Sequence, residues 1–203
     1  MPRNPSIEVP GGFFHITAHA AAQMTLYQDE WDYAAWLNML ERTVEAFHWR
    51  CYAYCAMPNH FHLVIETPEP TRGAGMRHLN GSYAQRYNTR HDGSGHVFQG
   101  RYRAKPIVHD SHFLVCCRYV VLNPVRAEIC TRPENWRWSS YRATVGIVPA
   151  PTFLCVDDVL ALFTVPDEQK RSAYARFVAD GIAESGPVQG PGPETWLRHA
   201  SRP

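Results

Sequence analysis

The stretch Met57–Glu66, Met-Pro-Asn-His-Phe-His-Leu-Val-Ile-Glu, constrains the fold of this chain more than any other. Its polar and apolar residues alternate, which predicts a strand with one buried face. Successive side chains of a strand point to opposite faces, and the strand rises about 3.3 Å per residue. His60 and His62 therefore project from the same face, close enough to hold one ion. The alternate residues from Phe61 to Ile65 form an apolar row on the other face.

Two turn-forming residues, Pro58 and Asn59, stand just before the histidines and predict a hairpin with an aromatic-rich strand at 50–56. By itself the histidine pair has two interpretations. The rings are either solvated or satisfied by backbone groups, or they are ligands of a metal ion. A third ligand and a reactive group elsewhere in the chain would favour the metal site.

Hydrophobic periodicity predicts an alternation of strands and helices. Besides the hairpin, we expect a strand at 13–20, with His15 and Thr17 on one face, and an irregular edge strand at 96–108. The predicted helices are 31–49, 76–90, 112–122, 156–163 and 167–179, and 68–75 is predicted to be a linker. We expect the first helix to cover one face of the sheet. Asp110-Ser111 is expected to cap the third helix, and Pro124 to end it.

Length and composition exclude several classes of protein. A chain of 203 residues with 45% hydrophobic content is long enough for a sizeable core in one or two domains. It contains no run of about 18 apolar residues, so we expect no membrane span. The start of the chain has no apolar segment typical of a secretory signal. Of the six cysteines, Cys116 and Cys117 are adjacent, which favours free thiols in a reducing cytoplasm.

The formal net charge of +1 conceals a segregation of charge. Between Thr71 and Thr144 there are twelve basic residues, eleven of them arginine, against four acidic ones. The segments on either side are acidic. Arginine binds phosphate in a bidentate manner and stacks on bases, so this segment indicates a nucleic-acid partner, with an ordinary solvated basic face as the alternative. Arg101, Arg103 and Lys105 of the edge strand are expected to line a groove.

The helix at 112–122 brings two further reactive groups together. Tyr119 and Asn123 are four residues apart and share a helical face. Tyr119 offers a hydroxyl nucleophile, and Asn123 offers an oxygen that would complete a His, His, Asn metal shell with His60 and His62.

Each of these roles has a rival within the sequence. Tyr83 and Tyr87, at helical spacing downstream of the histidines, are a second possible nucleophile pair. Cys51, Cys55 and the two histidines could form a structural zinc site. Because Cys51 and Cys55 are about 13 Å apart along a strand, that arrangement is disfavoured. The segment Trp136–Tyr141 is either a core clamp or a base-stacking platform.

Four segments in order, with a fifth at the start, resemble the single-tyrosine HUH transposases, in particular their REP-associated tyrosine transposase branch. They are Met57–Val64, Gly95–Tyr102, Cys117–Ala127, Trp136–Tyr141 and the opening strand Gly12–Thr17. The resemblance covers residues 11–145. It implies an N-terminal arm at 1–10, a transposase domain at 11–145, and a helical extension with a Gly/Pro-rich tail at 146–203.

The resemblance implies an α+β fold with a ferredoxin-like antiparallel sheet and packed helices. It also implies cleavage and rejoining of single-stranded, hairpin-containing DNA. Tyr119 would form a 5′-phosphotyrosine link, and the stored phosphodiester energy would allow rejoining without a nucleotide triphosphate. His60, His62 and Asn123 would hold Mg²⁺ or Mn²⁺, of which Mn²⁺ accepts both nitrogen and oxygen ligands.

The arginine-rich segment would then bind the DNA backbone. The residues expected to do so are Arg86, Arg90, Arg101, Arg103, Lys105, Arg118 and Arg126. A homodimer is possible. Two other functions are also compatible with these residues: a protein that binds hairpin DNA without cutting it, and a metal-dependent nuclease that uses water.

Overall fold

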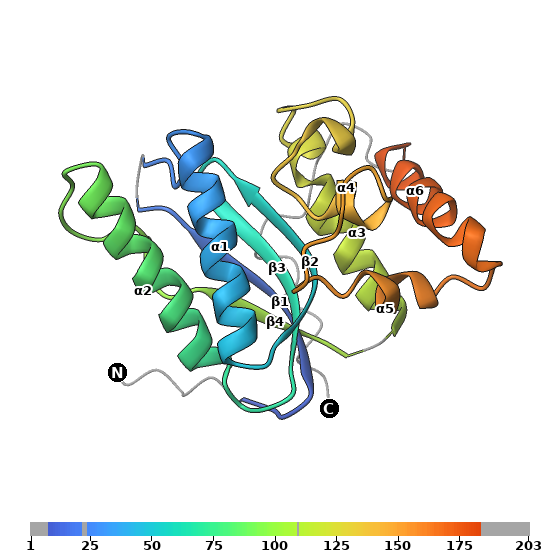
Figure 1. Ribbon diagram of the computed structural model, residues 1–203, viewed down its shortest axis with the longest axis horizontal. Helices are drawn as coiled ribbons and strands as arrows, with labels where there is room; N and C mark the ends of the chain where they lie inside the picture. The colour runs from blue at the N-terminus through green and yellow to red at the C-terminus, as the bar shows by residue number, and fades with distance from the viewer. Residues whose placement is uncertain (1–7, 22–23, 109, 184–203) are drawn as a thin grey trace, which may run out of the picture.

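The computed structural model describes residues 8–21, 24–108 and 110–183 (Figure 1). The first six elements follow the order β1, α1, β2, β3, α2, β4. The strands are β1 Gly12–His19, β2 Arg50–Met57, β3 His60–Thr67 and β4 Arg103–Ile107, and the helices are α1 Glu30–Ala46 and α2 Arg72–Arg90. This βαββαβ order is that of a ferredoxin-like fold.

The four strands form one antiparallel sheet in the order β2-β3-β1-β4. Residues Pro58 and Asn59 form the turn between β2 and β3, as predicted. The carbonyl groups of this turn accept hydrogen bonds from Leu26 N (2.7 Å) and Ala20 N (2.8 Å), which fix the hairpin to the end of β1. The predicted fold class, α+β with a ferredoxin-like antiparallel sheet and packed helices, is confirmed.

Helices α1 and α2 lie side by side on one face of the sheet (Figure 1). The alternation in β3 explains this packing, because Phe61, Leu63 and Ile65 are fully buried on that face. The Trp36 ring of α1 lies 4.9 Å from the Phe61 ring, centroid to centroid. This face is therefore the dry core of the molecule.

The other face of the sheet is covered by α3, Asp110–Arg126 (Figure 1). Phe113 of this helix packs edge-on against Phe13 of β1 and Tyr52 of β2. The chain then forms η1 Pro133–Asn135, α4 Tyr141–Thr144, α5 Val156–Ala161 and α6 Asp167–Ala183. Helix α6 packs against α3. The C-terminal helices thus support the back of the helix that carries Tyr119.

The segment 68–75, predicted to be a linker, is helical from Arg72 onward. The glycines that suggested a linker have a packing role instead. A Cβ atom at Gly75 would lie 2.2 Å from the Trp49 ring, so only glycine lets the helix approach this closely. The linker prediction was wrong for 72–75, because it treated the glycines as signs of flexibility, whereas 68–71 lie outside any helix or strand.

Pro124 does not end α3, which continues to Arg126. Proline lacks the N–H that would bond the carbonyl oxygen of Val120. The side-chain amide of Asn123 lies 3.4 Å from this oxygen and 2.8 Å from Tyr119 O, and so partly replaces the missing donor. The helix starts at Asp110, but the side chains of 110–111 lie outside the described residues, so the predicted cap stays a prediction.

The segment Trp136–Tyr141 acts as a clamp along the edge of β2. The Trp136 indole N–H donates to Ala56 O (3.0 Å), and the Trp138 ring stacks on Tyr33 of α1 at 4.6 Å. Ser140 Oγ accepts a hydrogen bond from Tyr54 N (3.1 Å). Of the two predicted uses of this cluster, the core clamp is the one that these contacts support.

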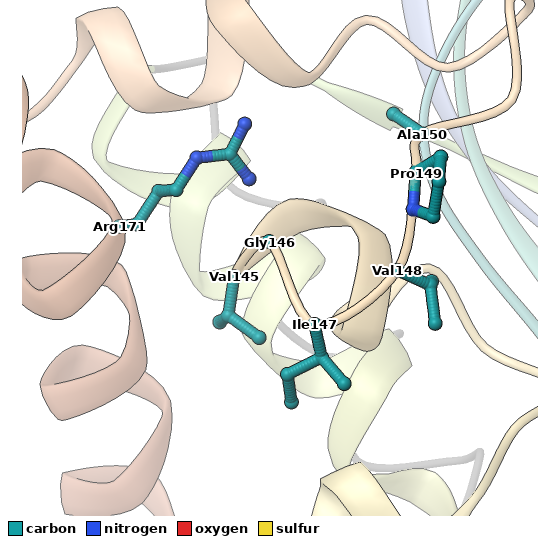
Figure 2. Close-up of a pocket in the computed structure, with 7 residues that line it drawn as sticks. All are labelled: Val145, Gly146, Ile147, Val148, Pro149, Ala150 and Arg171. Atoms are coloured by element: carbon teal, nitrogen blue, oxygen red, sulfur yellow. The ribbon is translucent and has the colours of Figure 1, made fainter.

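A shallow hollow of about 510 Å³ lies between the loop Val145–Ala150 and α6 (Figure 2). Arg171 extends from α6 to donate to Ala143 O (3.1 Å) and Thr144 O (3.0 Å). Gly146 has φ of 83°, and a Cβ atom there would lie 2.9 Å from Arg171 Nη1. Arg171 thus links α6 to the end of α4 beside this hollow. None of the predicted site residues lines the hollow.

All six cysteines are free thiols, as predicted. In the part of the chain that the structure describes, no helix is both long and apolar enough to cross a membrane.

Candidate active site

Four histidines gather on the sheet face beneath α3. The antiparallel pairing of β1 with β3 places His19 opposite His60 and Thr17 opposite His62. The His19 and His60 rings stack with their centroids 4.8 Å apart, and the His60 and His62 rings meet edge-on at 4.9 Å. His15 stacks on His62 at 5.2 Å. Two strands, and not one, therefore build the cluster.

Hydrogen bonds fix one nitrogen of His60 and one of His62. Nδ1 of His62 lies 3.0 Å from His15 Nε2 and 3.2 Å from Thr17 Oγ1. Nδ1 of His60 lies 2.8 Å from Asn59 Oδ1, an oxygen that only accepts, so Nδ1 carries the proton and Nε2 keeps a lone pair. Nε2 of His62 is buried and, among the described residues, has no partner with hydrogen-bond geometry.

The surroundings keep these imidazoles neutral. Burial, the largest cause, lowers the pKa of His15 and that of His60 to about 4, and the pKa of His62 well below its ordinary value of 6.5. The ammonium of Lys105 adds to the effect on the His15 pKa. Neutral imidazole is the form that binds metal ions, so the cluster is in the ligand state at neutral pH.

Helix α3 places Tyr119 at the border of this cluster. Its neighbours Val120 and Val121 are fully buried, whereas Tyr119 is 39% exposed. The Tyr119 ring meets His15 edge-on at 5.6 Å and His62 at 5.7 Å. The phenol thus combines contact with the histidines and access to solvent, as a nucleophile requires.

Asn123 lies one turn beyond Tyr119 on the same helix. Its amide nitrogen donates to Tyr119 O, and because a carbonyl oxygen only accepts, the Oδ1 atom of Asn123 must take the other position of the amide. Asn123 lies against His62, where its side chain acts in the direction that raises the His62 pKa, against the larger effect of burial. Asn123 thus lies beside His62, whose ring also contacts that of His60.

This donor set fits a divalent ion. Imidazole with amide oxygen suits Mn²⁺, and the buried, unpartnered Nε2 of His62 is the kind of atom that a bound metal satisfies. Among the described residues, no three Cys, His, Asp or Glu side chains are arranged to hold a metal. Burial also raises the pKa values of Cys51 and Cys55, which disfavours the thiolates that zinc needs. The structural-zinc alternative therefore gains no support.

Comparison with known proteins identifies the family to which this arrangement belongs. A family model described as "Transposase IS200 like" matches residues 11–123. The chain belongs to the IS200-like transposase family. This is a family of HUH single-strand DNA nucleases. No protein among the curated sequences is a significant match.

Two solved structures are similar to this chain, and one of them shares its fold. A REP-associated tyrosine transposase bound to a REP hairpin is similar over 73% of this chain and 89% of its own length, with a TM-score of 0.63 and 15% sequence identity. A putative transposase from Deinococcus radiodurans R1 is similar over 67% of this chain and 96% of its own length, with a TM-score of 0.39 and 17% identity. The first of these shows the shared fold.

The rival tyrosines, Tyr83 and Tyr87, have structural roles. Tyr83 is 1% exposed and its hydroxyl donates to Leu26 O. The Tyr87 hydroxyl donates to Thr25 O (3.1 Å) and accepts from Gln28 Nε2 (2.9 Å). Burial raises the pKa of Tyr83. Both phenols anchor α2 to the loop that follows β1.

Of the predicted DNA-binding residues, four are exposed and Arg126 is half-buried beside Tyr119. Arg103 and Lys105 are exposed on β4, opposite Thr17 and His15 of β1. The Arg126 guanidinium lies over the Tyr119 ring, 4.9 Å from its centroid. Arg86 and Arg101 are also exposed, but Arg86 lies on α2, which covers the face of the sheet opposite to the histidines.

Two other arginines have structural contacts instead. Arg90 forms ion pairs with Asp29 (2.5 Å) and Asp32 (2.6 Å), which join the end of α2 to the start of α1. Arg118 lies over the Phe177 ring of α6 at 4.5 Å, and its Nη1 donates to Phe177 O (3.3 Å). These roles compete with the predicted DNA binding.

Sequence reasoning did not assign His15, His19 or Thr17 to the site. A signal was present, since these residues alternate along one predicted strand and so share a face. The missing information was the register with β3, which sets His15 and Thr17 beside His62. A strand's own sequence does not state its partner.

Proposed function

We propose that this protein cleaves and rejoins single-stranded, hairpin-containing DNA through a 5′-phosphotyrosine intermediate on Tyr119. His60, His62 and Asn123 would hold Mg²⁺ or Mn²⁺. The observation that carries the proposal is the contact of the solvent-accessible Tyr119 ring with His62, whose Nε2 has no hydrogen-bond partner among the described residues. A nucleophile, a ligand set and a basic edge strand would then meet at one place on the sheet.

A divalent ion held by these three residues would polarise a phosphodiester oxygen and orient the phosphate. The Tyr119 hydroxyl would lose its proton and form a bond to phosphorus, while the bond from phosphorus to the 3′ oxygen breaks. The 3′ oxygen takes up a proton and becomes a free hydroxyl. Because one phosphoester replaces another, a second 3′ hydroxyl can reverse the step and rejoin the DNA without a nucleotide triphosphate.

The residues around Tyr119 would prepare it for this attack. The His15 and His62 rings both contact the phenol edge-on, and α3 is buried against the sheet immediately beyond it. The guanidinium of Arg126 lies over the phenol ring, where it would favour the developing phenolate and approach the phosphate. Such preorganisation lowers the cost of bringing nucleophile and phosphate together.

The DNA strand would run along β4. Arg103 and Lys105 are exposed on this edge strand, directly across from β1 residues that contact His62. A phosphate backbone on this edge would place one phosphodiester at the histidines. The similar solved structure holds a REP hairpin, which supports a hairpin as the substrate class for this chain as well.

The test is to incubate the protein with Mn²⁺ and labelled single-stranded DNA that contains a hairpin, and then to denature the sample. We expect a protein–DNA adduct that survives denaturation and disappears when EDTA replaces Mn²⁺. Because the hairpin sequence is unspecified, a library of hairpins with randomised flanking strands is the appropriate probe.

The outcomes separate the proposed activity from its alternatives. Cleavage without adduct would indicate a nuclease that uses water. Retention of the hairpin library without cleavage would indicate a binding protein that has kept the scaffold. Neither outcome is compatible with a tyrosine transposase.

A further inference from the structure

We infer that His15 is a positioning residue that sets the tautomer of His62 and thereby directs the Nε2 lone pair of His62 toward the metal position. This inference rests on the proposed function, because it assigns a role relative to the proposed metal ligands. It concerns a residue of β1, outside the His-Phe-His motif.

The geometry around His62 leaves a choice between two hydrogen-bond directions. Nδ1 of His62 and Nε2 of His15 are 3.0 Å apart, so one donates and the other accepts. If His62 donates from Nδ1, its Nε2 carries a lone pair and can bind a metal ion. If His15 donates, the Nε2 of His62 carries the proton and cannot.

The proposed ligand role of His62 decides between the two. His62 is 5% exposed, its buried Nε2 has no partner at hydrogen-bond geometry among the described residues, and the Asn123 side chain, the third proposed ligand, acts on the same ring. A metal ion between His62 and Asn123 needs the Nε2 lone pair, so the Nδ1 proton must then be donated to His15 or Thr17. A lone pair at Nε2 is satisfied as soon as a metal ion binds. The arrangement therefore favours donation from His62 Nδ1 to His15.

Thr17 completes this arrangement. Its hydroxyl lies 3.2 Å from the same Nδ1 atom and can accept the same proton. Both partners come from one face of β1, and the register of β1 with β3 sets their positions. Metal-binding histidines generally donate their second ring N–H to a neighbouring acceptor, which fixes ring orientation and tautomer. Here that acceptor is chiefly another imidazole.

His15 also touches the nucleophile. Its ring stacks on His62 at 5.2 Å and meets Tyr119 edge-on at 5.6 Å. One side chain thus supports a metal ligand and the tyrosine together. A substitution that preserves the ring but removes its nitrogens separates the packing role from the hydrogen-bond role.

The experiment compares His15→Phe, which keeps the ring contacts, with His15→Gln, whose side-chain oxygen can accept the Nδ1 proton. His78→Gln is the control, because His78 lies on α2 in another layer and bonds Thr43 Oγ1. The first readout is the tautomer of His62 in the metal-free protein, from two-bond ¹H–¹⁵N correlations of ¹⁵N-histidine-labelled samples. The second is Mn²⁺ affinity by titration calorimetry.

We expect His62 to carry its proton on Nδ1 in the wild type and in His15→Gln, and to gain the Nε2–H tautomer in His15→Phe. Mn²⁺ affinity should fall about 10- to 100-fold in His15→Phe, as for other outer-shell partners. His15→Gln should recover most of this loss, and His78→Gln should match the wild type. Urea unfolding of the metal-free variants verifies that each is folded.

Two results would overturn the role of His15 and leave the proposed function standing. One is a wild-type His62 with its proton on Nε2, and the other is a His15→Phe variant that binds Mn²⁺ as tightly as the wild type. Equal losses in His15→Phe and His15→Gln would overturn the hydrogen-bond role. If His62→Ala binds Mn²⁺ as well as the wild type does, the metal site of the proposed function fails instead. The tautomer measurement needs no metal, so the two failures can be distinguished.

Discussion

The two faces of the sheet differ in what they bury. Beneath α1 and α2, the residues of β3 are Phe61, Leu63 and Ile65, all fully buried and packed on aromatic side chains such as Trp36. Beneath α3, the same strand presents His60 and His62. One strand with a period of two therefore supplies stability on one face and chemistry on the other.

This difference explains how the fold tolerates a buried polar atom that lacks a hydrogen bond. His62 is buried with an unpartnered nitrogen, which destabilises the folded protein, yet its neighbours along the strand contribute apolar burial on the opposite face. Helix α3 adds an apolar part of its own, where Phe113 packs on Phe13 and Tyr52. The site is thus a small polar cluster at one end of an otherwise apolar layer between α3 and the sheet.

The largest effect should come from removing the nucleophile. Tyr119→Phe keeps the ring contacts with His15 and His62 but lacks the hydroxyl, so we expect no adduct with hairpin DNA in the presence of Mn²⁺. Tyr83→Phe should form adduct at the wild-type rate and lose stability instead, since it breaks a buried hydrogen bond, worth about 0.5 to 1.5 kcal/mol. Adduct formation by Tyr119→Phe would refute the assignment of the nucleophile.

Adjacent residues on β3 test the separation of the faces directly. Leu63→Ala should lower the free energy of unfolding by about 2 to 5 kcal/mol and leave Mn²⁺ affinity unchanged. His62→Leu should abolish Mn²⁺ binding and change stability by less than about 1.5 kcal/mol in either direction, since the loss of the unsatisfied Nε2 offsets the loss of the hydrogen bonds to His15 and Thr17. Urea unfolding and calorimetry measure the two effects. If both variants lost stability and Mn²⁺ affinity to a similar extent, the two faces would not have separate roles.

Arg118 tests where the basic residues act. Arg118→Leu should lower the free energy of unfolding by about 0.5 to 1 kcal/mol, because it removes a cation–π contact with Phe177. The salt dependence of hairpin binding should stay as in the wild type. Arg103→Ala should have the converse result, with the slope of log K against log salt reduced by about one. A reduced slope in Arg118→Leu would return this arginine to the DNA interface.

The smallest effect concerns the ion pair between α1 and α2. The Arg90 guanidinium, through its hydrogen bonds, lowers the pKa of the Asp29 carboxyl to about 2 from an ordinary value of 3.8. A depressed carboxyl pKa contributes stability above the unfolded value, and this contribution is lost as pH falls from about 4 to about 2. The urea midpoint of the wild type should therefore fall more steeply over this range than that of Arg90→Met. Parallel curves would show that the pair adds no stability.

Local periodicity predicted much of this molecule. The alternation in 57–66 is enough to place the two histidines on one face and the apolar row on the other, because a strand's period does not depend on its partners. The spacing of Tyr119 and Asn123 likewise predicts a shared helical face. Both arguments use only neighbours in the chain.

Only the tertiary structure decided which of these groups meet. The register of β1 with β3 set His15 and Thr17 beside His62, and the packing of α3 on the open sheet face brought Tyr119 to the same place. Packing also buried Tyr83 and gave Gly75 a role against Trp49 that its local sequence does not indicate. Contacts between residues distant in the chain depend on how whole faces fit together, and no local period encodes that fit.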